Sequence, residues 1–154
     1  MLYVAGLALL FGLSVSAYAA TDWSPLLDWV GKYPSEKVGA RTSRLIDQPA
    51  LATVLKRLLP PREWTAWSHF DVEVPVRQVE GFLVVDRCVP HNCPSDIATV
   101  AIDVQRQRVW AGFFSREAGR VSTRWDGTGE DYSVLPEEIR KAFLTRHGDG
   151  DPTQ

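Results

Sequence analysis

Consecutive strand-like segments between Asp71 and Gly127 constrain the fold of this chain more than any other feature. They are DVEVPVRQV (71–79), FLVVDRC (82–88), IATVAIDV (97–104), VWAGFFS (109–115) and VSTRW (121–125). Their connections are short, with a Glu80-Gly81 turn and a polar QRQR stretch at 105–108. A parallel pair of strands needs a crossover of about a dozen or more residues, whereas a short turn joins antiparallel neighbours. We therefore predict a five-stranded antiparallel meander sheet.

The first of these segments has its own pattern. Val72, Val74 and Val76 alternate with polar residues, which predicts a strand with one buried face. Pro75 has no backbone N–H to donate, so this strand is expected at an edge of the sheet.

Helical patterns lie on both sides of the strand region. Ser24-Pro25 opens a predicted short capped helix, and a polar loop follows at 33–44. A second helix, ended by Pro60-Pro61, has an apolar stripe of Leu51, Val54, Leu55, Leu58 and Leu59. A third begins at Pro136-Glu137-Glu138 and closes at Gly148, with Ile139, Ala142 and Phe143 on its apolar side. The prediction is an α+β fold: N-terminal helices, then the strands, then a C-terminal helix, with the helices packed on the sheet.

Length and charge bound the function. The chain has 154 residues, which suits one domain, and a net charge of -2, which gives no basic field for nucleic acid. Hydrophobic residues make up 45% and include six tryptophans, which predicts a packed domain rather than disorder.

Residues 1–20 are predicted to be a signal peptide. They hold no charge, their apolar run spans Leu2 to Val15, and Ala17-Tyr18-Ala19 has the small-x-small pattern of a cleavage site. Cleavage is expected after Ala19 or Ala20, which leaves 21–154 as a single mature domain. No Lys or Arg precedes the run, which a true start upstream of Met1 would explain. The alternative is an uncleaved anchor, for which the run is short. No lipid-attachment cysteine follows the leader, so the expected location is the periplasm.

The two cysteines of the chain lie in one short segment, CVPHNC, from Cys88 to Cys93. In an exported chain, two cysteines with none left over predict a disulfide. A ring this small stabilises the fold by only about 2 kcal/mol. Its larger effect is local, because the bond and the fixed φ of Pro90 restrict Val89, His91 and Asn92. We expect a rigid loop at the end of the sheet that carries an imidazole.

The loop and its surroundings resemble the Ivy family, inhibitors of vertebrate lysozyme. The resemblance consists of a C-x-P-H-x-C loop between two strands, a Trp-containing stretch before the first strand, the strand order, and an apolar strand that ends in GFFS. It implies a meander sheet between two helical layers (α/β/α). It also implies an inhibitor of c-type lysozyme, neither an enzyme nor a cofactor-dependent protein.

The resemblance also assigns roles to residues. The inhibitory loop would comprise Cys88, Val89, Pro90, His91, Asn92 and Cys93. His91 would enter the glycosidase cleft between the two catalytic carboxyl groups, with Asn92 as a neighbouring hydrogen-bonding contact. Better-known members carry lysine in place of Val89, and some carry aspartate in place of Asn92, so affinity and target range are open. Lytic transglycosylases share a glycan cleft and are a further candidate partner. Some members dimerise, so a homodimer is open as well.

Other interpretations of the same residues remain open at this point. Cys88, His91 and Cys93 could be zinc ligands, or a cysteine could act as a nucleophile or a redox group. Aspartates in the tail suggest calcium, without the spacing of a calcium loop. His69 and His147 are expected to be scaffold residues. Trp64, Trp67, Trp110 and Trp125 are expected mainly in the core. As a sugar platform they would indicate a glycan-binding module of the cell envelope, which is the alternative function.

Overall fold

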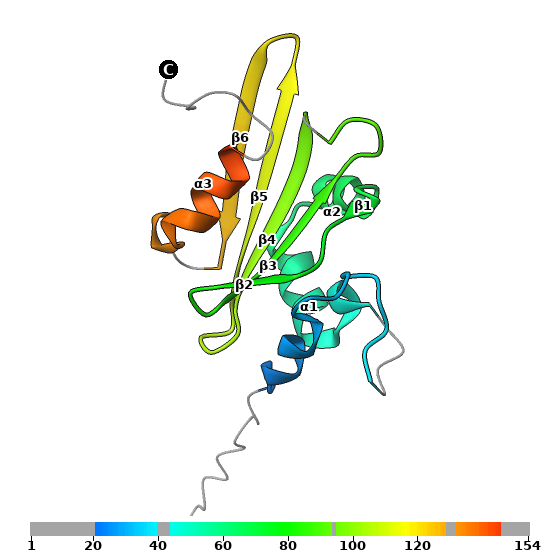
Figure 1. Ribbon diagram of the computed structural model, residues 1–154, viewed down its shortest axis with the longest axis vertical. Helices are drawn as coiled ribbons and strands as arrows, with labels where there is room; N and C mark the ends of the chain where they lie inside the picture. Colours follow the sequence, from blue (N-terminus) through cyan, green and yellow to red (C-terminus); the bar gives the residue numbers. More distant parts are fainter. Residues whose placement is uncertain (1–20, 40–43, 94, 129–131, 146–154) are drawn as a thin grey trace, which may run out of the picture.

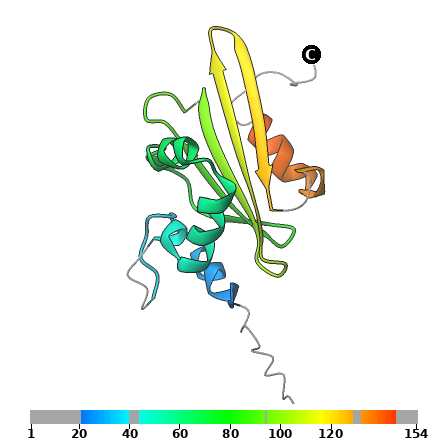
Figure 2. The same ribbon diagram turned by 180° about the vertical axis from the view of Figure 1, so that it is seen from behind.

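The computed structural model describes residues 21–39, 44–93, 95–128 and 132–145. A twisted antiparallel sheet lies between two helical layers (Figure 1). The N-terminal helices cover one face and the C-terminal helix covers the other (Figure 2). The predicted α+β fold with helices on both faces of a meander sheet is therefore confirmed.

The sheet follows the chain order from one edge to the other. Its strands are β1 (Val72–Glu73), β2 (Arg77–Val79), β3 (Phe82–Cys88), β4 (Asp96–Asp103), β5 (Arg108–Glu117) and β6 (Arg120–Gly127). The order is β1-β3-β4-β5-β6, and β2 also pairs with β3. All of these pairs are antiparallel.

The segment predicted as one first strand is two short strands. β1 and β2 lie end to end along β3 and are separated at Val74–Pro75, where the proline cannot donate to the ladder. The expected edge position is confirmed, but the expected buried face is wrong in part. Val76 is buried, whereas Val72 and Val74 are 39% and 38% exposed. In β1 the residue between them, Glu73, faces Arg87 and Trp67, so the two valines point to the other face.

One face of the sheet carries the larger core, beneath four short helices. These are η1 (Ser24–Trp29), η2 (Leu45–Asp47), α1 (Pro49–Leu58) and α2 (Pro61–Ser68). The predicted stripe on α1 is confirmed, since Leu51 and Leu55 are fully buried and pack against the sheet.

Two predictions for this region need correction. Pro60-Pro61 ends α1 as expected, but Pro61 also begins α2, a helix that the sequence pattern did not predict. The first helix is a short 3-10 helix that includes Ser24, and Asp22 rather than Ser24 accepts hydrogen bonds at its start.

The opposite face carries a smaller core under η3 (Tyr132–Val134) and α3 (Glu137–Thr145). Ile139 and Phe143 of α3 are buried there, as predicted, and the Phe143 ring packs at a tilt of 59° against Trp125, with ring centroids 4.8 Å apart. The Trp125 ring lies directly over Gly112, where a Cβ would come within 2.9 Å of it. A glycine is therefore required at this position of β5, opposite Trp125 of β6.

Several predicted features lie outside the described residues: the signal peptide with its cleavage site, the helix end at Gly148, His147 and the aspartates of the tail. Among the described residues, none of the helices has both the length and the apolar character needed to cross a membrane.

Candidate functional site

The cysteine loop connects β3 to β4 at one end of the sheet. Cys88 and Cys93 form a disulfide with their Cα atoms 4.8 Å apart, as the sequence predicted. Both cysteines of the chain are consumed in this bond. The thiolate that a zinc ligand, a nucleophile or a reduced redox site needs is therefore missing. Within the described residues, no three or more His, Cys, Asp or Glu side chains gather in a way that could hold a metal ion.

Inside the ring, the backbone forms a tight turn. The Asn92 N–H donates to the Val89 carbonyl at 2.9 Å, which places Pro90 and His91 at the two central positions. Proline suits the first of these because its φ is already fixed. His91 has a φ of +63°, the left-handed conformation that the second central position of a type II turn requires. Glycine or asparagine is most common at this position, and histidine also adopts a positive φ more often than most other residues do.

The ring points some side chains inward and others to solvent. Val89 packs against the larger core. The two cysteines pack with Ile97, Phe114 and Phe143 on the opposite side. Pro90 and His91 are exposed, and they are the residues of the ring that protrude most. The loop therefore presents the imidazole at its tip, while Val89 anchors its base.

Asp96, the first residue of β4, fastens the far side of the loop. Its Oδ2 accepts a hydrogen bond from the Asn92 side-chain amide, and its Oδ1 accepts one from Ser115 Oγ at 2.8 Å. Its backbone N–H donates to the Asn92 carbonyl at 2.9 Å. The Asn92 amide thus has a partner inside the protein. Sequence reasoning missed Asp96, because its role depends on the register that brings Ser115 opposite it.

Residues 50–148 match the family described as Inhibitor of vertebrate lysozyme (Ivy). This stretch covers most of the chain and includes the whole sheet, the loop and α3. The chain belongs to the Ivy family. Ivy proteins are inhibitors that act on a protein target, lysozyme, and are not enzymes. Neither the curated proteins nor the solved structures gave a significant match.

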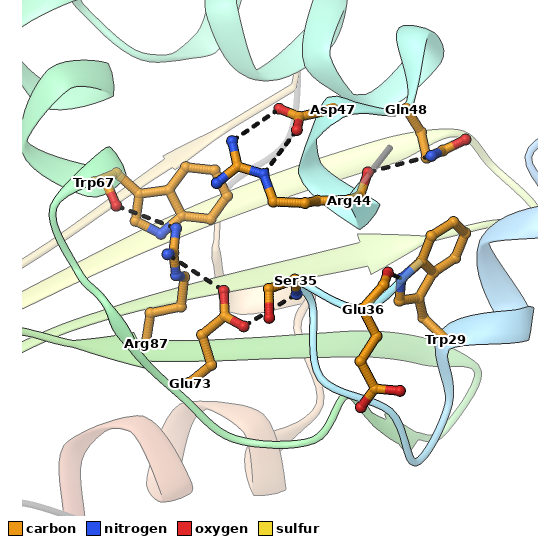
Figure 3. A network of polar contacts seen from close by, with 9 residues as sticks. All are labelled: Trp29, Ser35, Glu36, Arg44, Asp47, Gln48, Trp67, Glu73 and Arg87. Carbon is orange, nitrogen blue, oxygen red and sulfur yellow. Dashed lines mark hydrogen bonds and ion pairs between the residues drawn. The ribbon is translucent and has the colours of Figure 1, made fainter. Parts of the chain in front are cut away.

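In this Ivy protein the residue before the loop is held by a buried ion pair (Figure 3). Arg87 lies directly opposite Glu73 across β1 and β3, and its Nη2 is 3.2 Å from Glu73 Oε1. Its Nη1 donates to the Trp67 carbonyl at 3.3 Å, and its guanidinium lies 5.6 Å from the centroid of the Trp67 ring. Burial lowers the pKa of the Arg87 guanidinium, and the charge of Glu73 offsets part of that shift. Removing either partner would leave the other charge buried, which is strongly destabilising.

Further polar contacts link Glu73 to the N-terminal segment and join residues within that segment. The Ser35 N–H donates to the other oxygen of Glu73 at 3.0 Å, and the Trp29 indole donates to the Glu36 carbonyl at 3.0 Å. Arg44 and Asp47 form a neighbouring ion pair at 2.7 Å (Figure 3). Arg87, at the end of β3 that carries the Ivy loop, is thus held by Glu73 and Trp67, and Glu73 is held in turn by Ser35.

The remaining residues singled out from the sequence lie away from this loop or inside the protein. Trp23, Trp29, Trp67 and Trp110 are buried, and Trp64 and Trp125 are half-buried. The tryptophans are core residues, as predicted, and do not form an exposed sugar platform. His69 is exposed at the C-terminal end of α2.

Proposed function

We propose that this chain is an exported inhibitor of c-type lysozyme that inserts the loop Cys88–Cys93 into the glycosidase cleft. The observation that carries the proposal is the position of His91. It is exposed at the tip of a disulfide-closed turn, and its backbone is held in the left-handed conformation.

The chemistry of the target suits an imidazole. Retaining glycosidases such as lysozyme work with two carboxyl groups about 5 to 5.5 Å apart. A protonated imidazole has two N–H donors on opposite sides of its ring, one for each carboxylate. Each such charge-assisted hydrogen bond contributes roughly 1.5–3 kcal/mol. An inserted His91 would occupy both catalytic groups and exclude the sugar.

The construction of the loop favours tight binding. Three interactions fix the loop backbone before it binds a partner: the disulfide, the turn hydrogen bond and the hydrogen bonds between Asp96 and Asn92. A segment that is already ordered loses less conformational entropy when it binds. In this proposal Val89 and Asn92 act mainly as supports, because their side chains contact the core and Asp96.

The proposed location is the periplasm and the proposed mature domain is 21–154. The uncharged leader of residues 1–20 with its small-x-small pattern supports export. The disulfide supports an oxidising compartment.

The test is the rate at which a purified c-type lysozyme lyses cell walls, in the presence of the mature protein or its His91→Ala variant. We expect stoichiometric inhibition by the wild type and inhibition about ten- to several-hundred-fold weaker by the variant. If neither protein inhibits, the proposal fails for lysozyme, and lytic transglycosylases and purified peptidoglycan become the targets to assay. Equal inhibition by both would keep the function and refute the role of His91.

A further inference from the structure

The hairpin formed by β5 and β6 extends beyond the rest of the sheet, at the end where the loop lies (Figures 1 and 2). β4 starts at Asp96, which pairs with Ser115. Beyond that point Arg116 and Glu117 pair only with Val121 and Arg120 of β6. We call residues 116–121 the hairpin tip.

The hairpin tip is held in a fixed position relative to the loop. The Arg116 N–H donates at 2.7 Å to the carbonyl of Ser95, two residues after the disulfide ring. The turn residues Ala118 and Gly119 have φ values of +48° and +79°, the pattern of a two-residue type I′ turn. Such a turn matches the twist of its strands and keeps the hairpin regular to its end.

One face of the tip forms a shallow polar hollow of about 420 Å³. It is lined by Ser115, Glu117, Ala118, Arg120, Val121 and Ser122. The pairs Ser115–Ser122 and Glu117–Arg120 lie opposite each other, so hydroxyl, carboxylate and guanidinium groups share this face. It is also the face on which Ser115 bonds to Asp96, next to the loop. Val121, which is 47% exposed, lies opposite Arg116 and points to the other face of the hairpin.

The loop alone is too small for a stable complex. A specific protein–protein interface buries about 800 Å² on each partner, from roughly 20–30 residues a side. In the ring only Pro90 and His91 are exposed. Stoichiometric inhibition therefore requires a second surface on the same side of the protein. The hairpin tip is hydrogen-bonded to Ser95, between the loop and β4, and projects past the sheet beside the loop.

We propose that the hairpin tip is a second contact surface for lysozyme and lies against the rim of the cleft that the loop enters. This inference rests on the proposed inhibition of lysozyme. Charge at the tip would then influence which lysozyme is bound. Glu117 would attract a basic rim, whereas Arg116 and Arg120 would oppose it. The tip would thus favour lysozymes whose rim is less basic than average.

The first test shortens the hairpin and leaves the loop intact. Residues 117–120 are deleted and Arg116→Asn and Val121→Gly are introduced, so that a two-residue turn joins Ser115 to Ser122 in the same register. The dissociation constant for purified c-type lysozyme is measured by calorimetry, beside the thermal unfolding midpoint. We expect binding at least tenfold weaker with a similar midpoint.

Charge variants keep the proposal testable even if the shortened protein fails to fold. Against a basic lysozyme at low salt, Glu117→Lys should weaken binding about threefold or more, and Arg120→Glu should strengthen it. Arg57→Glu is the matched control, because Arg57 is exposed on α1 near Gln107 at the opposite end of the sheet. It should leave the dissociation constant within about twofold.

The outcomes separate this inference from the proposed function. If the wild type binds and inhibits lysozyme, while the shortened protein and both tip variants bind equally well, the hairpin tip is not a contact surface and the function stands. If the wild type neither binds nor inhibits, both proposals fall. Weaker binding by the shortened hairpin and Glu117→Lys, with no change in the Arg57→Glu control, supports the tip as a contact.

Discussion

At the scale of single residues, His91 combines an unfavourable backbone with an exposed imidazole. A residue with a Cβ costs roughly 1–2 kcal/mol in the left-handed conformation, and glycine avoids that cost. We predict that His91→Gly is more stable to urea than His91→Ala by about 1 kcal/mol. Both variants should lose inhibition to a similar extent.

This comparison separates function from folding at position 91. If His91→Gly were less stable than His91→Ala, the left-handed backbone at position 91 would not be a source of strain. If His91→Gly inhibited as well as the wild type, the imidazole would not be the inhibitory group.

Exchanging the side chains at positions 92 and 96 tests whether the hydrogen bond between Asn92 and Asp96 holds the loop in place. Asn92→Asp places two carboxylates together in place of the amide-to-carboxylate hydrogen bond. A hydrogen bond to a charged group contributes about 1.5–3 kcal/mol, so we expect lower stability and weaker inhibition. Adding Asp96→Asn restores an amide–carboxylate pair with the donor reversed, and the oxygen of the new side-chain amide could still accept from Ser115 Oγ. The double variant should regain most of both properties in denaturation and inhibition assays. If the double variant regains neither stability nor inhibition, the hydrogen bond between positions 92 and 96 does not organise the loop.

At the scale of elements, we expect the disulfide to contribute more to the order of the loop than to the stability of the whole fold. The Cys88→Ser and Cys93→Ser double variant should lose only about 2 kcal/mol of unfolding free energy, since the ring is short. The free energy of binding to lysozyme should fall by more than this, because ordering each freed backbone residue costs about 1–2 kcal/mol and four residues lie between the cysteines. Denaturation and inhibition are measured on the same protein samples. Inhibition that is unchanged without the disulfide would contradict a role for preorganisation.

The sequence predicted the sheet well because its signals are local. β3 has the predicted bounds, 82–88, since its apolar run lies between a Glu80-Gly81 turn and the first cysteine. Two elements were misjudged at prolines. Pro75 divides a strand, and Pro61 starts α2 although it also follows the end of α1. A proline pair indicates a break, but proline is also favoured in the first turn of a new helix.

The candidate site was predicted in part. The ring, its disulfide and its exposed histidine could be read from six consecutive residues. The hydrogen bonds of Asp96 and the ion pair between Arg87 and Glu73 could not be predicted from the sequence. Both depend on which residues face each other across neighbouring strands. The projection of the hairpin tip depends on the same register, since it begins where β4 has no further residue to pair.

At the scale of the whole molecule, the two ends of the sheet differ. The loop and the hairpin tip lie together at one end, and the turn between β4 and β5 lies at the other (Figure 1). Within the described part of the chain, the helices pack on the two faces of the sheet, and residues 117–121 of the hairpin tip are exposed at the first end. One end of the protein can therefore face a partner without disturbing either core.

Inhibition should depend on pH through the inserted imidazole. His91 can serve both carboxylates only while it is protonated. We therefore expect stronger inhibition at mildly acid pH and weaker inhibition at clearly alkaline pH, after correction for the titration of lysozyme itself. The His91→Ala variant provides the control, because its weaker inhibition should vary less with pH. A wild-type inhibition constant that stays flat over this range would argue against a protonated His91.

The most direct test of the account is a double-mutant cycle across the complex. Dissociation constants are measured for the wild type and His91→Ala, each with a c-type lysozyme and with the same lysozyme carrying glutamine in place of its catalytic glutamate. If the imidazole contacts that carboxyl group, His91→Ala should weaken binding to the unaltered lysozyme by at least about tenfold more than binding to the altered one. An equal loss with both lysozymes would show that His91 does not contact the catalytic glutamate and would contradict the proposed mechanism.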